Sequence, residues 1–219
     1  MDVFDIIGPV MIGPSSSHTA GAARIGRIAR ALLGEKPVRA QVGLHGSFAK
    51  TYKGHGTDRA IAGGILGMEP DDERIRDSLS TAIQEGLDIT FSPIHLDDAH
   101  PNTALITLTG ESGRQIQLQG ASVGGGSIHV TQVNGMAVDI SGEHTTLIVL
   151  HNDAPGTIAA VTEELSLRNV NICNFRLARA YKGGTAVMTI EVDGTVDTDL
   201  NGCVEKLPNV LSSTMLLPV

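Results

Sequence analysis

The sequence predicts an α+β protein of two successive domains, because the secondary-structure pattern changes near residue 142. Residues 1–142 combine helices with several short strands and glycine-rich connections, whereas residues 143–219 alternate regularly between strands and helices. The tripeptide Ser141-Gly142-Glu143 separates the two patterns. At 219 residues the chain is long enough to bury a core without disulfides. We therefore expect one domain over residues 1–142 and a second over residues 143–219.

The second domain is expected to follow the order βαββαβ, which is the ferredoxin-like arrangement. An apolar run over 145–151 predicts a buried strand, and Pro155 lies where a helix would begin after a turn. Apolar residues between 157 and 168 recur at helical spacing. The turn Lys182-Gly183-Gly184 predicts a hairpin. The remaining elements are expected as strands over 170–180, 185–192 and 210–217 and a helix over 197–206.

The first domain is expected to be a less regular α+β unit. A segment rich in Ala, Ile and Leu predicts a helix over 18–33, with Gly34 as its C-terminal stop. Further helices are expected over 58–66 and 71–85. Five short runs predict strands, at 38–44, 89–94, 104–108, 115–118 and 127–133.

Composition excludes several classes of function. A formal net charge of −8 argues against binding duplex DNA, and 3% aromatic residues argue against a stacking platform for single strands. The two cysteines, Cys173 and Cys203, are too few for a disulfide framework or for an unaided iron–sulfur cluster. No signal-like segment and no apolar run of about 18 residues is visible, so we expect a soluble cytoplasmic protein.

The first stretch that suggests chemistry is a run of hydroxyl residues, Ser15-Ser16-Ser17-His18-Thr19, directly before a predicted helix. Free backbone N–H groups and the positive end of a helix dipole favour an anion there, such as a substrate carboxylate. N-capping needs one serine, so four hydroxyl side chains and a histidine exceed that need. We interpret the run as a binding site, with plain N-capping as the alternative.

The second stretch, residues 45–58, holds His45 and His55 with two lysines and three hydroxyl residues among glycines. Because glycine offers a histidine nothing to pack against, we expect His55 to be exposed and available as a general acid or base. A flexible polar loop is the alternative. No HExxH or Cys/His spacing is present, so this chain alone is not expected to bind a metal.

Two further stretches are weaker signals, His100-Pro101-Asn102-Thr103 and the glycine-rich residues 120–127. Consecutive glycines let a backbone approach a ligand or another chain closely. The glycine-rich stretch lacks the GxxxxGK[ST] and GxGxxG forms, so it is not a nucleotide-binding signature. The other histidines, His95, His129 and His144, form no constellation and are assigned structural roles.

Taken together, four segments resemble the beta-chain family of bacterial iron–sulfur-dependent L-serine dehydratases: GPSSSHT (13–19), HGSFAKTYKGHGTD (45–58), HPNT (100–103) and GASVGGG (120–126). The resemblance covers nearly the whole chain. It implies that the first domain is a serine dehydratase beta domain, also called an allosteric-substrate-binding domain, which has relatives in some D-3-phosphoglycerate dehydrogenases. It also implies that the second domain is an ACT domain, a regulatory module that binds amino acids, often between paired copies.

The resemblance further implies that the chain acts with an alpha chain to convert L-serine to pyruvate and ammonia. A [4Fe-4S] cluster, ligated by cysteines of that alpha chain, would act as a Lewis acid towards the serine hydroxyl and carboxylate. This chain would then be one half of the enzyme, inactive alone and without a metal ligand of its own. Paired ACT domains would join two beta chains, and neither nucleic acid nor a membrane is an expected partner.

The same resemblance implies roles for individual residues. His55 is the preferred candidate for proton transfer, and His18 is the second. The substrate would be bound, or the histidines oriented, by Ser15, Ser16, Ser17, Thr19, Ser47, Thr51, Thr57 and Asp58. In the ACT domain an amino acid, most simply L-serine, would be held by His151, Asp153, Gly156 and Asn171, with Asn171 beside the turn over 151–156.

Two other interpretations were weighed. A free-standing amino-acid sensor could bind ligands through both domains without catalysis, and the βαββαβ domain is compatible with it. The histidine-rich motifs of the first domain favour catalysis, because a pure sensor has no need of them. A fragment of phosphoglycerate dehydrogenase is disfavoured because the chain has no GxGxxG dinucleotide-binding motif.

Overall fold

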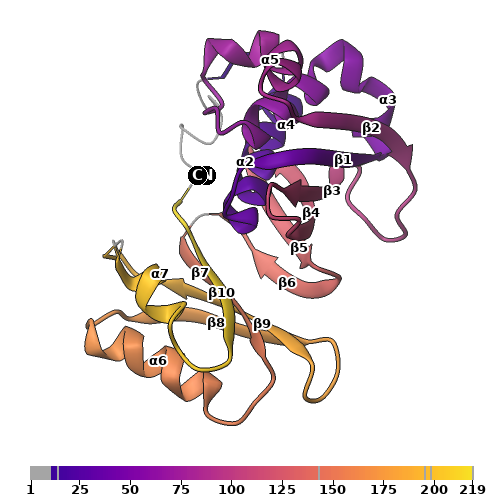
Figure 1. Cartoon of the computed structure of the whole chain (residues 1–219). Coiled ribbons are helices and arrows are strands. Elements are labelled where there is room, and N and C mark those ends of the chain that lie inside the picture. Colours follow the sequence, from indigo (N-terminus) through magenta and orange to yellow (C-terminus); the bar gives the residue numbers. More distant parts are fainter. Residues whose placement is uncertain (1–10, 14, 143, 195, 198, 219) are drawn as a thin grey trace. The chain divides into compact units, whose positions relative to one another are not determined.

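The computed structural model describes residues 11–13, 15–142, 144–194, 196–197 and 199–218. By its internal packing the chain divides into two compact units, Met1–Asn134 and Gly135–Val219. Figure 1 follows the chain through both units. No helix in the described part of the chain combines the length and apolarity needed to cross a membrane.

The first sheet has the strand order β2-β1-β3-β4-β5-β6. β1 pairs parallel with β2 and antiparallel with β3, and β4 continues antiparallel between β3 and β5. The parallel pair requires a crossover between β1 and β2, and the chain makes it with helices. The strands are β1 (Pro37–His45), β2 (Asp88–Ile94), β3 (Thr103–Gly110), β4 (Gln115–Gly124), β5 (Ser127–Val133) and β6 (Met136–Ile140).

Two glycines let the principal helices α2 (Ala22–Leu33) and α4 (Thr57–Ile65) pack closely (Figure 1). A Cβ at Gly64 would lie 2.0 Å from the carbonyl oxygen of Ala23, and one at Gly26 would lie 2.5 Å from that of Ile61. The buried face of α2 also packs against β3 and β4. The other helical segments are the π-helical turn η1 (Ser17–Gly21), α3 (Gly46–His55), the 3₁₀ turn η2 (Glu73–Asp77) and α5 (Ser78–Gln84).

The alternative of a flexible loop over residues 45–58 is wrong, because most of this stretch is the helix α3. Two of its glycines mark helix boundaries: Gly46 begins α3 with a φ of 60°, and Gly56 ends it with a φ of 73°. The expected helix over 18–33 begins with the π-helical turn η1 and ends, as predicted, at Gly34 in the left-handed conformation. The expected helix over 71–85 is divided into η2 and α5.

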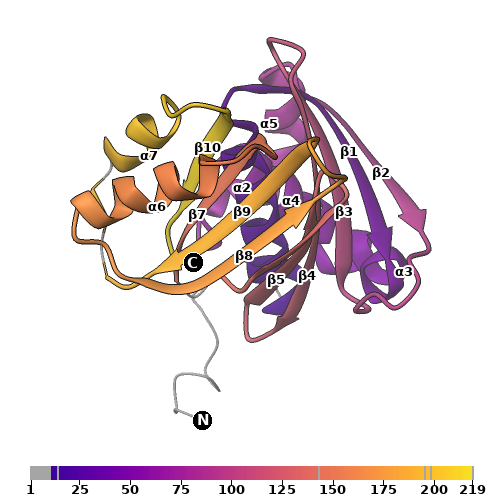
Figure 2. The same ribbon diagram turned by 90° about the horizontal axis from the view of Figure 1, so that it is seen from below.

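The second unit has the predicted order βαββαβ. Its antiparallel sheet has the order β10-β7-β9-β8. Both helices cover the same face, since residues from α6 and α7 share one buried cluster with strand residues of β7 and β9 (Figure 2). The elements are β7 (Thr145–Asn152), α6 (Thr157–Leu167), β8 (Ile172–Arg179), β9 (Thr185–Val192), α7 (Asp199–Val204) and β10 (Val210–Leu216).

Candidate active site

His18 is the centre of the candidate active site in the first unit. It lies in η1 and is only 8% exposed. Its Nδ1 is 3.3 Å from Oγ of Ser15, and its Nε2 is 3.3 Å from Oγ of Ser47. The ring also meets Phe48 edge-on, with the centroids 5.2 Å apart. Both nitrogens of His18 therefore face a hydroxyl, one from each of the two histidine-bearing motifs.

His55 lies beside His18. It is the last residue of α3, whereas Ser47 lies at the start of the same helix. The two ring centroids are 4.9 Å apart, and the rings are nearly perpendicular at 85°. Burial, and then the charge of His55, lower the pKa of His18 below its ordinary value. His18 is therefore neutral at neutral pH, whereas His55 is exposed. The pair places a buried proton acceptor next to one that a substrate can reach.

The HPNT segment fixes the start of α3. The backbone N–H of Ser47 donates to the carbonyl oxygen of Pro101 at 2.7 Å, and that of Phe48 donates to the same oxygen at 3.4 Å. A Cβ at Gly46 would lie 2.5 Å from this oxygen, so only glycine fits. Through these contacts Pro101 sets the position of the Ser47 hydroxyl beside His18.

The glycine-rich segment joins the same cluster. The N–H of Ser122 donates to the carbonyl oxygen of Asn102 at 3.0 Å, and the Ser122 side chain packs against Gly21, where a Cβ would lie 2.1 Å from its Oγ. Nη1 of Arg24 donates to the carbonyl oxygen of Gly126 at 2.7 Å. Four segments that are far apart in the sequence therefore meet around η1. The segments over 100–103 and 120–127, which are weak signals in the sequence, therefore both contribute to the site.

Three buried hydroxyls in these motifs, those of Thr19, Thr57 and Ser122, have no hydrogen-bond partner among the described residues. A buried hydroxyl without a partner costs about 1–3 kcal/mol. Stability alone would favour apolar side chains at these positions. Thr19 packs against Gly13, where a Cβ would lie 2.2 Å from the threonine hydroxyl oxygen.

The other predicted residues of this site make local contacts. The hydroxyl of Thr51 donates to the carbonyl oxygen of Ser47 at 2.9 Å within α3. A carboxylate oxygen of Asp58 accepts from the N–H of Arg59 at the start of α4. Ser16 and Ser17 are half-buried at the start of η1. Within the described part of the chain, no hydrogen bond joins these side chains to His18 or His55.

Comparison with known proteins places the chain in a family. Residues 2–86 match the serine dehydratase beta chain family model, and residues 147–212 match that of the AHAS small subunit-like ACT domain. A probable L-serine dehydratase beta chain of Bacillus subtilis (strain 168) is 50% identical over 98% of this chain and 97% of its own length. The L-serine dehydratase beta chain of Peptoniphilus asaccharolyticus is 38% identical over 92% of this chain and 91% of its own.

The chain belongs to the L-serine dehydratase beta-chain family. The expected relationship to phosphoglycerate dehydrogenases is also found. The D-3-phosphoglycerate dehydrogenase of Methanocaldococcus jannaschii is 26% identical over 60% of this chain and 27% of its own length. The four motifs that gave the family resemblance are therefore the segments that meet around His18 in this beta-chain family member.

The ACT domain of this family member holds a second candidate site at the turn after β7. Asp153 accepts from the N–H of Gly183 and from Nη1 of Arg179, both at 2.9 Å. The Gly183 hydrogen bond first, and then Arg179, lower the pKa of the Asp153 carboxyl. His151 is 1% exposed, with Nδ1 2.8 Å from the carbonyl oxygen of Asn152. Gly156, with a φ of 89°, begins α6.

The expectation that Asn171 lies beside this turn is wrong within one chain. β7 and β8 are both antiparallel to β9 and so run parallel to each other. Asn171 precedes β8, near the Val192 end of β9, whereas the turn follows β7 near the Ala186 end. The Asn171 amide instead donates to Asp193 at 2.6 Å. The α6 crossover returns the chain to the end of the sheet at which β7 began.

The described residues do not fit an iron–sulfur cluster. They contain no group of three or more His, Cys, Asp and Glu side chains placed to hold a metal ion. Cys173 is exposed on β8, and Cys203 lies on α7 with its Sγ 3.0 Å from Nη2 of Arg168. Both cysteines belong to the second unit, whereas the histidine pair belongs to the first.

Proposed function

We propose that this chain is the beta subunit of an L-serine dehydratase, which with an alpha chain converts L-serine to pyruvate and ammonia in the cytoplasm. The observation that carries the proposal is the meeting of four distant segments around His18 and His55. Membership of the L-serine dehydratase beta-chain family supports it. A non-catalytic sensor would have no use for a buried histidine in contact with an exposed one.

The cofactor of the assembled enzyme is a [4Fe-4S] cluster on the alpha chain. When bound, it supplies a Lewis acid that weakens the bond between the serine hydroxyl and its carbon. This chain supplies the groups that bind the substrate and move its protons. The alpha chain is therefore an obligatory partner of the histidine pair.

His55 removes the α-proton of L-serine. The electron pair of the broken C–H bond forms a double bond to the β-carbon, and the hydroxyl leaves as water with the proton that His55 has taken up. The resulting aminoacrylate hydrolyses to pyruvate and ammonia without further catalysis. His18, neutral and buried, positions His55 through the ring contact and is itself oriented by the Ser47 hydroxyl.

Ser15, Ser16, Ser17 and Thr19 bind the polar groups of the substrate at the start of η1. Ser47 orients His18. Thr51 and Asp58 stabilise α3 and the start of α4 on either side of His55, and Thr57 is the buried first residue of α4. In these roles, the residues of the first motif bind the substrate, and those of the second motif position the histidine pair.

The ACT domain binds L-serine as a regulator, at the turn over residues 151–156 of a beta-chain pair. Backbone N–H groups at the start of α6 donate hydrogen bonds to the ligand carboxylate, and Gly156 lets the carboxylate approach closely. Asp153, held by Arg179 and Gly183, presents a fixed negative charge to the ligand ammonium. Coupling between such a site and an active site is typically about 1–3 kcal/mol.

The test is coexpression of this chain with its alpha chain, anaerobic reconstitution with iron and sulfide, and a pyruvate assay. The proposal predicts pyruvate formation from L-serine only when both chains are present. An exposed histidine of the second unit, His144, gives a matched control as His144→Ala, which should retain activity. Absence of turnover from a correctly assembled, cluster-containing complex would contradict the proposal.

A further inference from the structure

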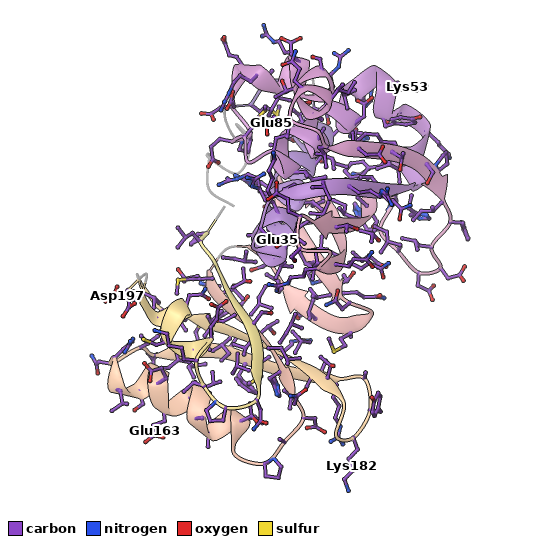
Figure 3. The ribbon with its side chains drawn as sticks, viewed as in Figure 1. Glu35, Lys53, Glu85, Glu163, Lys182 and Asp197 are labelled. Carbon is purple, nitrogen blue, oxygen red and sulfur yellow. The ribbon has the colours of Figure 1, made fainter. Side chains whose placement is uncertain are left out.

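A cavity of about 260 Å³ opens beside His55 in the first unit. Its wall includes Gly13 of the first motif, His55 itself and three basic residues, Lys53, Arg59 and Arg76. Figure 3 labels Lys53, which lies on the same helix as His55. Drug-sized ligands typically occupy about 300–1,000 Å³, so this cavity suits a smaller molecule.

The charge of the cavity wall is unbalanced. None of the nine lining residues is acidic. Within the described part of the chain, no carboxylate forms an ion pair with the side chains of Lys53, Arg59 or Arg76. Three like charges around one small volume repel one another, so an anion in the cavity lowers the electrostatic energy.

Two other arginines of the same unit form ion pairs with carboxylates, unlike those of the cavity wall. Arg74, two residues before Arg76, donates from Nε to the Asp72 carboxylate at 3.0 Å. Arg27 pairs with Glu69. Local carboxylates therefore compensate Arg74 and Arg27, whereas no ion pair of the described residues compensates the two arginines of the cavity.

We propose that this cavity receives the carboxylate of the amino-acid substrate, with Arg59 and Arg76 as the specificity-determining residues that select it. The inference rests on the proposed function and adds to it the residues whose positive charge binds the substrate carboxylate. A guanidinium binds a carboxylate through two parallel charge-assisted hydrogen bonds, which a serine hydroxyl cannot do.

The position of His55 connects this cavity to the reaction. His55 lines the same cavity as the two arginines. The carboxyl carbon of an amino acid is bonded directly to its α-carbon, so a carboxylate held by the arginines brings the α-proton to His55. Binding and proton removal are then coupled by the geometry of one small cavity.

The kinetic test uses the assembled enzyme with Arg59→Gln, Arg76→Gln or both in this chain. Each variant should raise the KM for L-serine by about tenfold, and the double variant by more, while kcat falls much less. The control is Arg74→Gln, which removes the same charge from an arginine that does not line the cavity and should leave KM unchanged. A double variant with the parent KM overturns the inference and leaves the proposed function standing.

The second readout needs no activity. The amide signals of Gly54 and Gly56, both in the cavity wall, are followed by NMR in the full beta chain during titration with L-serine, L-serinamide or inorganic phosphate. L-serine should shift them, L-serinamide should not, and the double variant should show no shift. A response to phosphate that L-serine neither reproduces nor displaces would assign the cavity to a separate anion and overturn the inference. If the parent assembly makes no pyruvate, the proposed function fails, and this titration still decides the inference.

Discussion

The two histidine-bearing sites, around His18 and around His151, differ in how their polar groups are satisfied. The nitrogens of His18 face hydroxyls from two segments, Ser15 and Ser47, and its ring meets His55. At the second site Asp153 is already bound by Arg179 and Gly183 of the same unit. The first site is assembled to act on a molecule that reaches His55, whereas at the second site the Asp153 carboxylate is paired within the unit and must exchange contacts to bind a ligand.

The largest effect is expected from His55→Ala in the assembled enzyme. Loss of a general acid or base lowers kcat by about 10²–10⁴-fold. The chain should still fold and bind the alpha chain, because His55 is exposed. Pyruvate assays measure kcat, and circular dichroism checks the fold. Near-parent turnover would move the proton transfer to His18 or to the alpha chain.

Gly46→Ala should lower both stability and activity, because it changes the backbone position at the start of α3. The new Cβ would meet the Pro101 carbonyl oxygen at 2.5 Å, at a φ of 60° that alanine adopts only with strain. A residue held in such a conformation costs about 1–3 kcal/mol, and relief of the clash would also displace Ser47 from His18.

The matched control is Gly86→Ala, which has a φ of 78° and nothing within 4 Å of its Cβ position. Urea unfolding of both variants separates the clash from the strain. Gly46→Ala should be the less stable of the two and should also lose activity. Equal stability with full activity would show that Pro101 does not set the position of α3.

Asp153→Ala should weaken L-serine binding at the second site by about tenfold, because the fixed negative charge facing the ligand ammonium is lost. The measurement is an NMR titration of the full chain, following the Gly183 amide, which contacts Asp153 in the free protein. Glu163→Ala, on α6, is the control and should bind as the parent does. Parent-like affinity in Asp153→Ala would indicate a module used for dimerisation alone.

The smallest effect concerns pH. Because the folded protein lowers the pKa of His18, the unfolded chain binds the proton more readily than the folded chain does. The free energy of unfolding should therefore fall as pH drops from about 7 to about 5, through the unfolded value near 6.5. His18→Asn should make this fall shallower, as seen in urea titrations at both pH values. A fall of unchanged slope would show that other groups cause it.

Local patterns were sufficient for the second unit, since the order βαββαβ needs only the periods of its strands and helices. The helix end at Gly34 was likewise predicted from one residue type. The assembly of the first site was not predictable in this way. Pro101 and Gly126 contribute through carbonyl oxygens, and a backbone acceptor leaves no mark in the residue type.

Two features of the structure escaped the sequence for different reasons. The helix α3 was not predicted because its segment is rich in glycine, although Gly46 and Gly56 mark the two ends of the helix. Asn171 was placed at the wrong end of the sheet because strand direction depends on the α6 crossover. The basic lining of the cavity beside His55 was not predicted either. Arg76 is distant in sequence from Lys53 and Arg59, and it reaches the cavity wall only because it lies in η2.

The most direct test of the account is a double-mutant cycle on His18 and His55 in the assembled enzyme. Residues that act as one unit give strongly non-additive losses of kcat. If the ring contact at 4.9 Å is the working unit, His18→Asn combined with His55→Ala should cost little more than His55→Ala alone. Losses that multiply would show that the two histidines act independently and would contradict the account.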